Sequence, residues 1–502
     1  MQYIQETFAL WSSGIHIFTS FDTHLLIFVG SVIGLLFGTL PGLSSSMALA
    51  IFIPFTFGFT PHQGIAFLIT IYTTSVFAGA LAAILVNIPG TPSSISTGFD
   101  GYPMAQRGEA GRAVGIATVA SALGGLVGLI FLMVFSPMIV LLARRFGSWE
   151  YVLLAVMGVT MISYISKGSI IKGLLGGTLG LFIATIGEDP IISYPRFSFG
   201  TYQLLGGIDF VVILIGLFGL AEVFLQLEKH IRAEPVVQTV SGFGRSFRDV
   251  LSRPVCLIRS SLIGTVIGAI PAAGPSIASV VSYGVAKRSS RNPEEFGNGS
   301  IDGILAAESS NNASVGGALI PMMTLGIPGD PMTAVLIGAL LVHGLSPGPR
   351  LFTDNPAYVS AVYLSYAIAL VWVLINGLLG ARWYAKLLSI PRHVLLPMIM
   401  VLCMVGSYSL NSNLFDVLIM VIFGVIGYLL QKAAISPAPI ILGVVLGPMF
   451  ETNLRRSMIL SRGSFMPFVT RPMSLAILAV IAYIIVSSVR QARRAGKNSS
   501  GV

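Results

Sequence analysis

Charged side chains are scarce in this chain: of its 502 residues only 10% are Asp, Glu, Lys or Arg, whereas 54% are hydrophobic. Soluble domains carry about 25% charged residues, so the chain lacks the polar surface that a protein in water requires. This shortage excludes a soluble enzyme, a nucleic-acid-binding protein and an intrinsically disordered protein. Together with a mean hydropathy of +0.86, it predicts an all-α integral membrane protein.

Cysteine and histidine are also too few to support a metal or redox centre. The two cysteines, Cys256 and Cys403, lie far apart in the sequence, which excludes a disulfide framework and a thiolate metal site. The six histidines show no ligand spacing, and neither an HExxH nor a GxxxxGKS/T motif is present. We therefore expect neither an enzyme nor a resident cofactor.

Basic residues are absent from the first hundred positions and gather later in the chain. The first is Arg107, so residues 1–20 lack the positive region of a cleavable signal peptide. The net charge of +9 is typical of membrane proteins whose cytoplasmic loops carry surplus Lys and Arg, and we expect no nucleic-acid partner. Residues 1–20 are predicted to lie outside the cytoplasm, and residues 228–259, which are rich in arginine, to form a cytoplasmic linker.

The apolar runs divide into two halves on either side of that linker. We predict a first membrane repeat at 21–227, a second at 260–472, a final transmembrane helix at 473–489 and a basic cytoplasmic tail at 490–502. Several runs are shorter than the roughly 20 residues of a full span and are joined in pairs by Gly, Pro and Ser. Such pairs are typical of re-entrant hairpins or broken helices. We expect about eleven crossings plus two re-entrant hairpins.

Two sequence matches across the linker indicate an internal repeat. Gly34–Pro41 aligns with Gly264–Pro271 at an offset of 230, and Ile88–Pro92 aligns with Ile327–Pro331 at an offset of 239. Both matches contain the Gly and Pro residues that interrupt helices. The repeat therefore places the helix breaks at corresponding positions in the two halves.

The basic residues indicate that the halves have opposite orientations. Loop 57–63 has no Lys or Arg while its counterpart 287–300 has several, and segment 100–112 is more basic than its counterpart 340–350. The excess of Lys and Arg thus lies on opposite ends of the corresponding helices in the two halves, which predicts inverted-topology repeats. Four arginines fall on the wrong side of this assignment: Arg144, Arg145, Arg455 and Arg456.

A helix break inside a membrane leaves backbone N–H and C=O groups without hydrogen-bond partners. Such a break persists only where protein, water or a ligand supplies those partners. In transporters with inverted repeats, half-helix N-termini at such breaks face anionic groups and backbone carbonyls hold a cation. The candidate substrate ligands at the breaks are Ser44, Ser45, Ser46, Asn87, Thr91, Ser276, Asn311 and Asn312. The candidate cation ligands are the carbonyls of Gly42, Gly90 and Gly329 and the carboxylates of Asp330 and Glu308.

Several of these candidates also have a purely structural interpretation. The serines at 44–46 can cap the following helix, and Glu308 can lie at the cytoplasmic interface just after Asp302. Asn311 and Asn312 can bond to neighbouring helices, a contact worth about 0.6 kcal/mol on average. Two adjacent asparagines face different sides of a helix, so at most one of them needs to line a site.

Seven stretches resemble the large permease subunit of the tripartite tricarboxylate transporter family, over roughly residues 20–470 and in the family's motif order. They are Gly38–Gly42 (GTLPG), Asn87–Pro92 (NIPGTP), Asp100–Ala105 (DGYPMA), Glu308–Ala313 (ESSNNA), Gly316–Pro321 (GGALIP), Leu325–Gly329 (LGIPG) and His343–Pro349 (HGLSPGP). The sequence departs from the family pattern at Ser44, where Gly is frequent, at Ala272, where Gly is expected, and at Phe77–Ala80.

The resemblance implies a permease of the bacterial inner membrane that works with a small membrane subunit and a periplasmic solute-binding protein. It also implies uptake of carboxylates driven by a cation gradient, usually of sodium. Proton coupling and the association of two copies into a homodimer stay open. On this basis the periplasmic side is the expected location of residues 1–20.

Our leading hypothesis is a secondary transporter that imports di- or tricarboxylates by cation symport, with hairpins that move to give alternating access. An ion channel is the alternative from another class, although paired breaks within one chain are not typical of it. An intramembrane enzyme needs a nucleophile with a base, or two facing carboxylates, and none stands out. A membrane scaffold gives no reason for buried Asn, Asp and Pro-Gly breaks.

Overall fold

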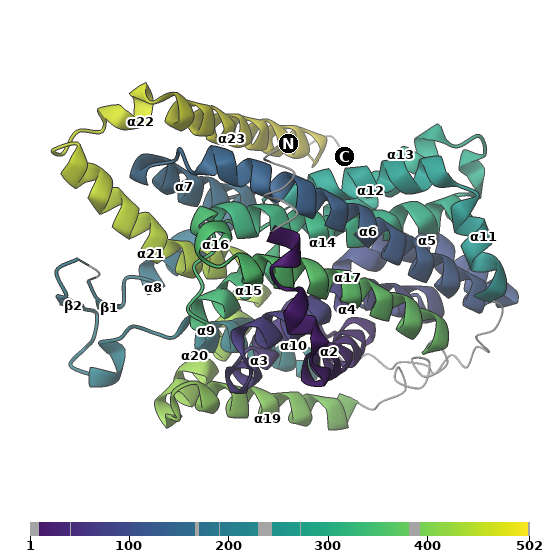
Figure 1. Cartoon of the computed structure of the whole chain (residues 1–502), viewed down its shortest axis with the longest axis horizontal. Helices are drawn as coiled ribbons and strands as arrows, with labels where there is room; N and C mark the ends of the chain where they lie inside the picture. The colour runs from purple at the N-terminus through teal and green to yellow at the C-terminus, as the bar shows by residue number, and fades with distance from the viewer. Residues whose placement is uncertain are drawn as a thin grey trace.

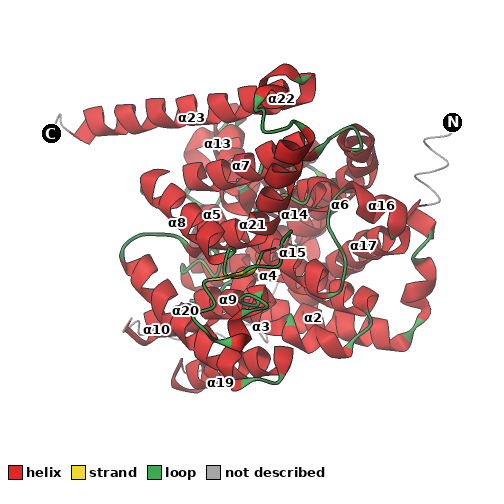
Figure 2. Cartoon of the chain, turned by 90° about the vertical axis from the view of Figure 1, so that its left-hand side faces the viewer, coloured by secondary structure: helices red, strands yellow, loops and turns green. Residues whose placement is uncertain are grey.

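The chain folds almost entirely into helices (Figures 1 and 2). The computed structural model describes residues 10–40, 42–165, 170–189, 191–228, 243–271, 273–380 and 392–499. Within these ranges β-structure is confined to β1 (Gly187–Glu188) and β2 (Pro195–Arg196), which pair antiparallel as a hairpin. The predicted all-α membrane fold is confirmed.

Eight helical segments of the described ranges are long and apolar enough to cross a membrane. They are α2 (Phe21–Thr39), α4 (Pro61–Val86), the run with α5 (Ile95–Met104) and α6 (Ala110–Ala143), the run with α9 (Phe210–Leu214) and α10 (Ala221–Glu228), α17 (Pro356–Leu379), α19 (Arg392–Asn411), α20 (Leu414–Lys432) and α21 (Pro437–Leu460). Shorter apolar segments lie in α7 (Ser148–Ile165), α8 (Ile170–Ile183), α12 (Pro254–Ala269), α15 (Pro331–Val342) and α23 (Pro472–Ser499). The count of about eleven crossings stays a prediction.

The other helices are short or polar. The α-helices are α3 (Ser45–Phe52), α11 (Ser246–Leu251), α13 (Gly274–Ser289), α14 (Ile301–Leu325), α16 (Pro349–Asp354) and α22 (Met466–Thr470). The 3₁₀ or π turns are η1 (Ile15–Thr19), η2 (Pro54–Gly58), η3 (Pro92–Ser94), η4 (Ala105–Glu109), η5 (Tyr202–Leu204), η6 (Ile215–Leu220), η7 (Phe243–Arg245) and η8 (Pro293–Glu295).

Helices α4 and α14 form the core of the bundle. α4 is buried from Gly64 to Leu85 and α14 from Gly303 to Thr324. α2 and α17 pack on α4, whereas α6, α12 and α13 pack on α14. Outside them, α7 and α8 contact α21, and α19 and α20 contact η6. A helix buried on all sides belongs in a protein interior, even where it carries polar residues.

All four predicted breaks interrupt helices. The helix pairs on either side of a break are α2 and α3, α4 and η3, α12 and α13, and α14 and α15. Pro92 and Pro331 occupy the first positions of η3 and α15, where the missing N–H costs no hydrogen bond. Two residues of these breaks, Pro41 and Ala272, lie outside the described ranges.

The two halves repeat the same helix contacts. A Cβ added to Gly38 would lie 2.2 Å from the carbonyl oxygen of Ser75, and one added to Gly268 would lie 2.3 Å from that of Ser314. Ser75 and Ser314 are 239 positions apart, which is the offset of the second sequence match. The two glycines therefore contact equivalent residues in the two halves. Glycine is required at both positions, since the helix backbones touch there.

The start of each central helix contacts the other half of the chain. Just before α4, Thr56 Oγ1 lies 2.9 Å from Nε2 of His343, which directly follows α15. Just before α14, the N–H of Ser300 donates to Asp100 Oδ1 of α5 at 2.8 Å. Each central helix thus begins beside the helix that follows the break in the other half, whereas the inverted orientation of the two halves stays a prediction.

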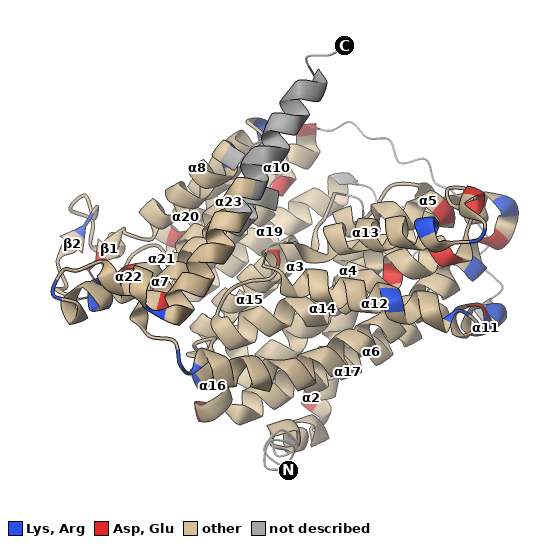
Figure 3. Ribbon diagram, turned by 90° about the horizontal axis from the view of Figure 1, so that it is seen from above, with Lys and Arg blue, Asp and Glu red and all other residues tan. Residues whose placement is uncertain are grey.

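Charged residues gather along two opposite edges of the bundle (Figure 3). The first edge includes β1, β2, α16 and α22, and the second includes α5, α10 and α11. Lys172 donates to the carbonyl of Ala433 at 2.6 Å, and Lys432 pairs with Glu228 at 2.8 Å, beside the end of α10. We call this second edge the lysine edge, since it also includes Lys287 in the last turn of α13.

A buried aspartate fixes the β1–β2 hairpin at the first edge. Asp189 Oδ1 accepts the N–H groups of Ile191 and Ile192 at 2.9 and 3.1 Å, and its Oδ2 lies 2.6 Å from Nη2 of Arg455. The N–H of Ile191, helped by that of Ile192 and by Arg455, lowers the pKa of Asp189 below its ordinary value. Arg455, which the charge count placed on the wrong side, therefore has a carboxylate partner there.

Two helix boundaries differ from the predicted division of the chain. α12 begins at Pro254, inside the range 228–259 that we predicted to be a linker, because proline suits the first position of a helix. α23 continues to Ser499, across the predicted boundary between a final helix at 473–489 and a tail at 490–502. Ala, Arg and Gln after position 489 are good helix formers, so the helix extends beyond its apolar part.

Candidate substrate and ion site

The helix breaks of the two halves meet around α4 and α14. α15 contacts α3 and α4, while η3 contacts α13 and α14. Within the first half, a Cβ added to Gly90 would lie 2.0 Å from the carbonyl oxygen of Gly38. Within the second half, a Cβ added to Gly329 would lie 2.9 Å from the carbonyl oxygen of Gly268. Glycine at these positions allows the breaks to pack against one another, and we call this region the break cluster.

Hydroxyl groups begin the helices of the first half at the break cluster. Ser44 caps α3, since its Oγ accepts the N–H of Met47 at 3.1 Å. Ser45 and Ser46 are buried behind it, and Ser46 Oγ lies 3.3 Å from Ser44 Oγ. Thr91 precedes η3 and is also buried. Ser44 thus has a structural role as the cap of α3, whereas the hydroxyls of Ser45 and Ser46 cap no helix.

Two predicted ligands lie outside the buried part of the break cluster. Asn87 ends α4 in the left-handed conformation with a φ of 54°, and its side chain is exposed. Its counterpart Gly326 ends α14 in the same way, with a φ of 69°, so this position serves the helix end. The carbonyl of Gly42 accepts Gln226 Nε2 at 3.3 Å. That carbonyl therefore already has a protein donor.

The second half brings Ser276 and Asp330 to the break cluster. Ser276 is half-buried in the first turn of α13. A Cβ added to nearby Gly274, whose φ is 63°, would lie 3.2 Å from the Cβ of Asp330. Gly90 and Gly329 are both buried. The start of α13 therefore lies against the start of α15.

Asp330 caps α15 and is fully buried. Its Oδ1 accepts both the N–H and the hydroxyl of Thr333 at 2.7 Å, and its N–H donates to the same hydroxyl at 2.9 Å. The hydroxyl of Tyr72 on α4 donates to the other carboxylate oxygen. These partners form a capping box with one contact from the other half. Protein donors thus satisfy both oxygens of Asp330.

Glu308 is fully buried within α14 and caps no helix. Its carboxylate accepts the hydroxyl of Thr97 on α5 and that of Ser121 on α6, the latter at 2.8 Å. Among the described residues, no Lys or Arg lies within 4.0 Å of Glu308 or Asp330. A carboxylate buried without a cation is costly, so Glu308 needs an explanation beyond α14 itself.

Asn311 and Asn312 are the least satisfied polar side chains near the break cluster. Asn311 Nδ2 donates to the carbonyl of Val76 on α4 at 3.2 Å, but its Oδ1 has no hydrogen-bond partner in the described ranges. Neither amide atom of Asn312 has such a partner, although the side chain is fully buried. A buried polar group left unpaired costs about 1–3 kcal/mol. Asn312 is therefore better suited to a ligand than to packing.

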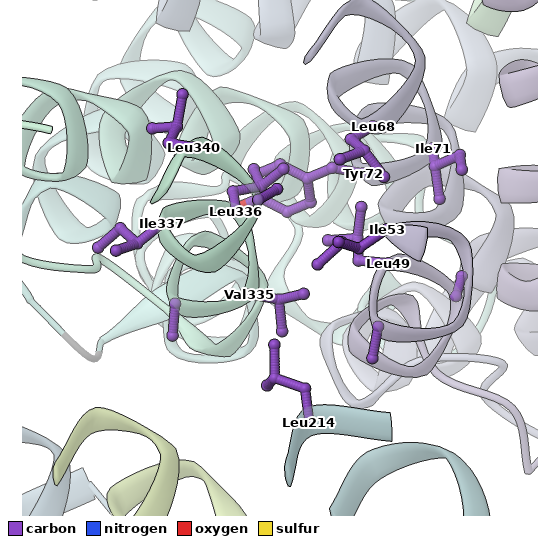
Figure 4. Close-up of a cluster of buried hydrophobic side chains, with 14 of the residues drawn as sticks. Leu49, Ile53, Leu68, Ile71, Tyr72, Leu214, Val335, Leu336, Ile337 and Leu340 are labelled. Atoms are coloured by element: carbon purple, nitrogen blue, oxygen red, sulfur yellow. The ribbon is translucent and has the colours of Figure 1, made fainter. Parts of the chain in front are cut away.

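An apolar wall lies beside Tyr72 between α3, α4 and α15 (Figure 4). It contains Leu49, Ile53, Leu68, Ile71, Leu214, Val335, Leu336, Ile337 and Leu340. Leu49 and Ile53 come from α3 and its end, and Leu336 and Leu340 come from α15. Close-packed aliphatic side chains thus fill the space between the break cluster and the end of α15 at His343.

Several residues that position the candidate side chains were missed in the sequence. Tyr72 bonds to Asp330, Thr97 and Ser121 bond to Glu308, and the hydroxyl of Tyr366 donates to the carbonyl of Asn312 at 2.8 Å. The internal repeat could have indicated one of these residues, Tyr72. It stands 239 positions before Asn311 and so occupies the equivalent position in the first half. The hydroxyl partners of Glu308 lie on other helices, where no local pattern marks them.

Long apolar helices, some of them broken beside buried polar groups, define a multi-pass membrane protein. Residues 25–442 match the tripartite tricarboxylate transporter TctA family, and the chain belongs to this family. The resemblance described from the sequence motifs is thereby confirmed. Members of this family are transporter subunits rather than enzymes.

Similar proteins in Agrobacterium vitis have no described activity. One is an uncharacterized 52.8 kDa protein in the TAR-I ttuC′ 3′ region, 39% identical over 462 residues that cover 92% of each chain. Another is an uncharacterized protein in the TAR-II ttuC′ 3′ region, 42% identical over 218 residues, which are 43% of this chain and 90% of that relative. No solved structure matches the chain.

Proposed function

We propose that the chain is the large permease subunit of a binding-protein-dependent secondary transporter that imports di- or tricarboxylates across the bacterial inner membrane. Family membership supports the transporter class. The observation that carries the substrate site is Asn312, whose fully buried amide has no partner among the described residues. A carboxylate oxygen is an acceptor that the Asn312 amide N–H groups can satisfy.

The carboxylate docks in the break cluster, where helix starts offer positive dipole ends. α3, α13 and α15 begin there, and each helix N-terminus carries roughly half a positive charge on its free N–H groups. In this proposal the substrate ligands are Ser44, Ser45, Ser46, Thr91, Ser276, Asn311 and Asn312. Asn87, which is exposed, contacts substrate only if the neighbouring segments move.

Charge balance favours symport with a cation. Asp330 and Glu308 are both buried without a basic side chain within 4.0 Å in the described ranges. A di- or tricarboxylate adds further negative charge to this interior, which is unfavourable unless cations enter with it. The backbone carbonyls of Gly90 and Gly329 and the two carboxylates supply oxygen ligands, the kind that hard cations prefer. Sodium is our proposed coupling ion, with the proton as the other candidate.

The arrangement of basic residues favours one orientation. Lys172, Lys287 and Lys432 lie at the lysine edge, which we therefore assign to the cytoplasm. The first edge then faces the periplasm, where the solute-binding protein delivers substrate. Alternating access follows from movement of the paired half-helices relative to the outer helices, in the manner of other inverted-repeat transporters.

We expect uptake of labelled citrate or succinate into proteoliposomes when the small membrane subunit and the periplasmic binding protein are present together with an inward sodium gradient. Without the gradient, uptake should fall to the level of empty vesicles, because the anion alone cannot enter a site that is already negative. Replacement of the sodium gradient by a proton gradient decides between the two ions. Flux far above transporter turnover and independent of both gradients would contradict the proposal and favour a channel.

A further inference from the structure

The two buried carboxylates of the interior have different surroundings. Asp330 is held by the capping box at the start of α15 and by Tyr72. Glu308 lies eight positions into α14, where it has no capping role, and it accepts the hydroxyls of Thr97 and Ser121 and the side chain of Asn311. The geometry accounts for Asp330 as a structural cap but leaves Glu308 without a structural purpose.

Oxygen atoms from three helices converge at Glu308. The Glu308 carboxylate belongs to α14, the Thr97 hydroxyl to α5 and the Ser121 hydroxyl to α6. Hydroxyl oxygens can rotate to donate to a carboxylate or to direct a lone pair toward a cation. Ser309 is also fully buried, and its Oγ has no hydrogen-bond partner in the described ranges. A single carboxylate among neutral oxygens suits a monovalent metal cation.

A further set of buried hydroxyl groups lies on α5, α12 and α13, which all contact α14. Ser96 Oγ on α5 lies 3.0 Å from Ser279 Oγ on α13, and Ser282 Oγ donates to the carbonyl of Ser260 on α12 at 3.4 Å. All four side chains are fully buried. We call these residues the hydroxyl seam. It contrasts with the aliphatic side chains of the apolar wall.

We propose that Glu308, with Thr97 and Ser121, binds the coupling ion, a monovalent metal cation such as sodium, and that this ion is released along the hydroxyl seam to the lysine edge. The proposal rests on the transporter function proposed above and assigns the ion to one of its two buried carboxylates. Asn311 lies three residues after Glu308 on the same helix face. The amide of Asn311 thus links the ion to the substrate site.

Binding of radioactive sodium to the purified full chain tests the ion site without any carboxylate present. We expect Glu308→Gln, which keeps the shape of the side chain, to weaken sodium binding by at least about tenfold, as the loss of a charged ligand does. Thr97→Val removes one oxygen at constant shape and should weaken binding by a smaller factor. Glu150→Gln is the matched control, because Glu150 is an equally buried carboxylate that pairs with Arg471 at the first edge.

The outcomes separate this inference from the proposed function. Unchanged sodium affinity in both Glu308→Gln and Thr97→Val overturns the ion site, even if the wild-type chain transports carboxylates. Absence of sodium binding in a wild-type chain that transports with a proton gradient also overturns it. Failure of all gradient-driven uptake, with sodium binding still dependent on Glu308, overturns the transporter function instead.

Thiol labelling tests the route in a chain with Cys256 and Cys403 replaced by serine. We expect a cysteine at Ser96 or Ser279 to react from the lysine edge during transport, and faster with a positively charged reagent than with a negatively charged one. Leu336→Cys in the apolar wall is the control and should stay unreactive from that side. Equal rates for both reagents, or reaction at Leu336→Cys alone, would contradict the cation route.

Discussion

Replacement of Asn312 by leucine should reduce carboxylate uptake by about 10- to 100-fold while the chain becomes no less stable. A hydrogen bond to a charged group contributes about 1.5–3 kcal/mol, and each 1.4 kcal/mol corresponds to about a factor of ten. Neither amide atom of Asn312 is paired in the described ranges, so leucine removes no internal hydrogen bond. Uptake into proteoliposomes and the melting temperature of the purified variant measure the two effects.

Asn376→Leu is the matched control for this substitution. Asn376 lies on α17 and donates to Ser31 Oγ at 3.1 Å, away from the break cluster. Its replacement should lower stability by about 0.5–1.5 kcal/mol through the lost hydrogen bond and leave uptake unchanged. If Asn312→Leu instead unfolds the chain, or transports at the wild-type rate, Asn312 is a structural residue and the substrate site lies elsewhere.

Replacement of Gly90 by alanine should destabilise the chain by about 1–3 kcal/mol, as overpacking of a tight contact does. A Cβ at this position would lie 2.0 Å from the carbonyl oxygen of Gly38 and 3.0 Å from the Cα of Gly79. Both neighbours are backbone atoms, which cannot rotate away as a side chain can. The two breaks of the first half must therefore move apart. We expect the melting temperature to fall and carboxylate uptake to be lost.

Gly284→Ala provides the control, because it makes the same chemical change within α13. No atom lies within 4 Å of a Cβ added to Gly284, and alanine is favoured over glycine in a helix by up to about 1 kcal/mol. This variant should be at least as stable as the wild type. Equal stability of Gly90→Ala and Gly284→Ala would contradict the close contact between Gly90 and Gly38.

The sequence allowed the breaks to be predicted because Gly and Pro act locally. Pro92 and Pro331 stand where helices begin again, and the two sequence matches mark both partners of each pair. The same repeat places Gly38 and Gly268 against equivalent carbonyls. Helix ends that depend on propensity rather than on Gly or Pro were harder to predict, as the extension of α23 to Ser499 demonstrates.

The partners of the candidate ligands could not be predicted, since they depend on how helices pack. Ser121 on α6 and Thr97 on α5 are ordinary hydroxyl residues until packing brings them to Glu308. Asn87 illustrates the opposite case. Its residue type suggested a ligand, yet its left-handed conformation at the end of α4 gives it a backbone role. Sequence patterns therefore predicted the helix breaks better than the contacts of the individual candidate ligands.

Protection of a cysteine at position 276 tests most directly whether the break cluster binds the carboxylate. Ser276→Cys is close to isosteric and half-buried at the start of α13, and Cys256 and Cys403 would be replaced in the same chain. We predict that citrate or succinate, whichever the wild-type chain transports, slows thiol labelling of this cysteine in the presence of the coupling ion. Ser464→Cys, between α21 and α22, should label at the same rate with and without substrate. Labelling of Ser276→Cys that stays unaffected by a substrate which the same variant transports would contradict the account.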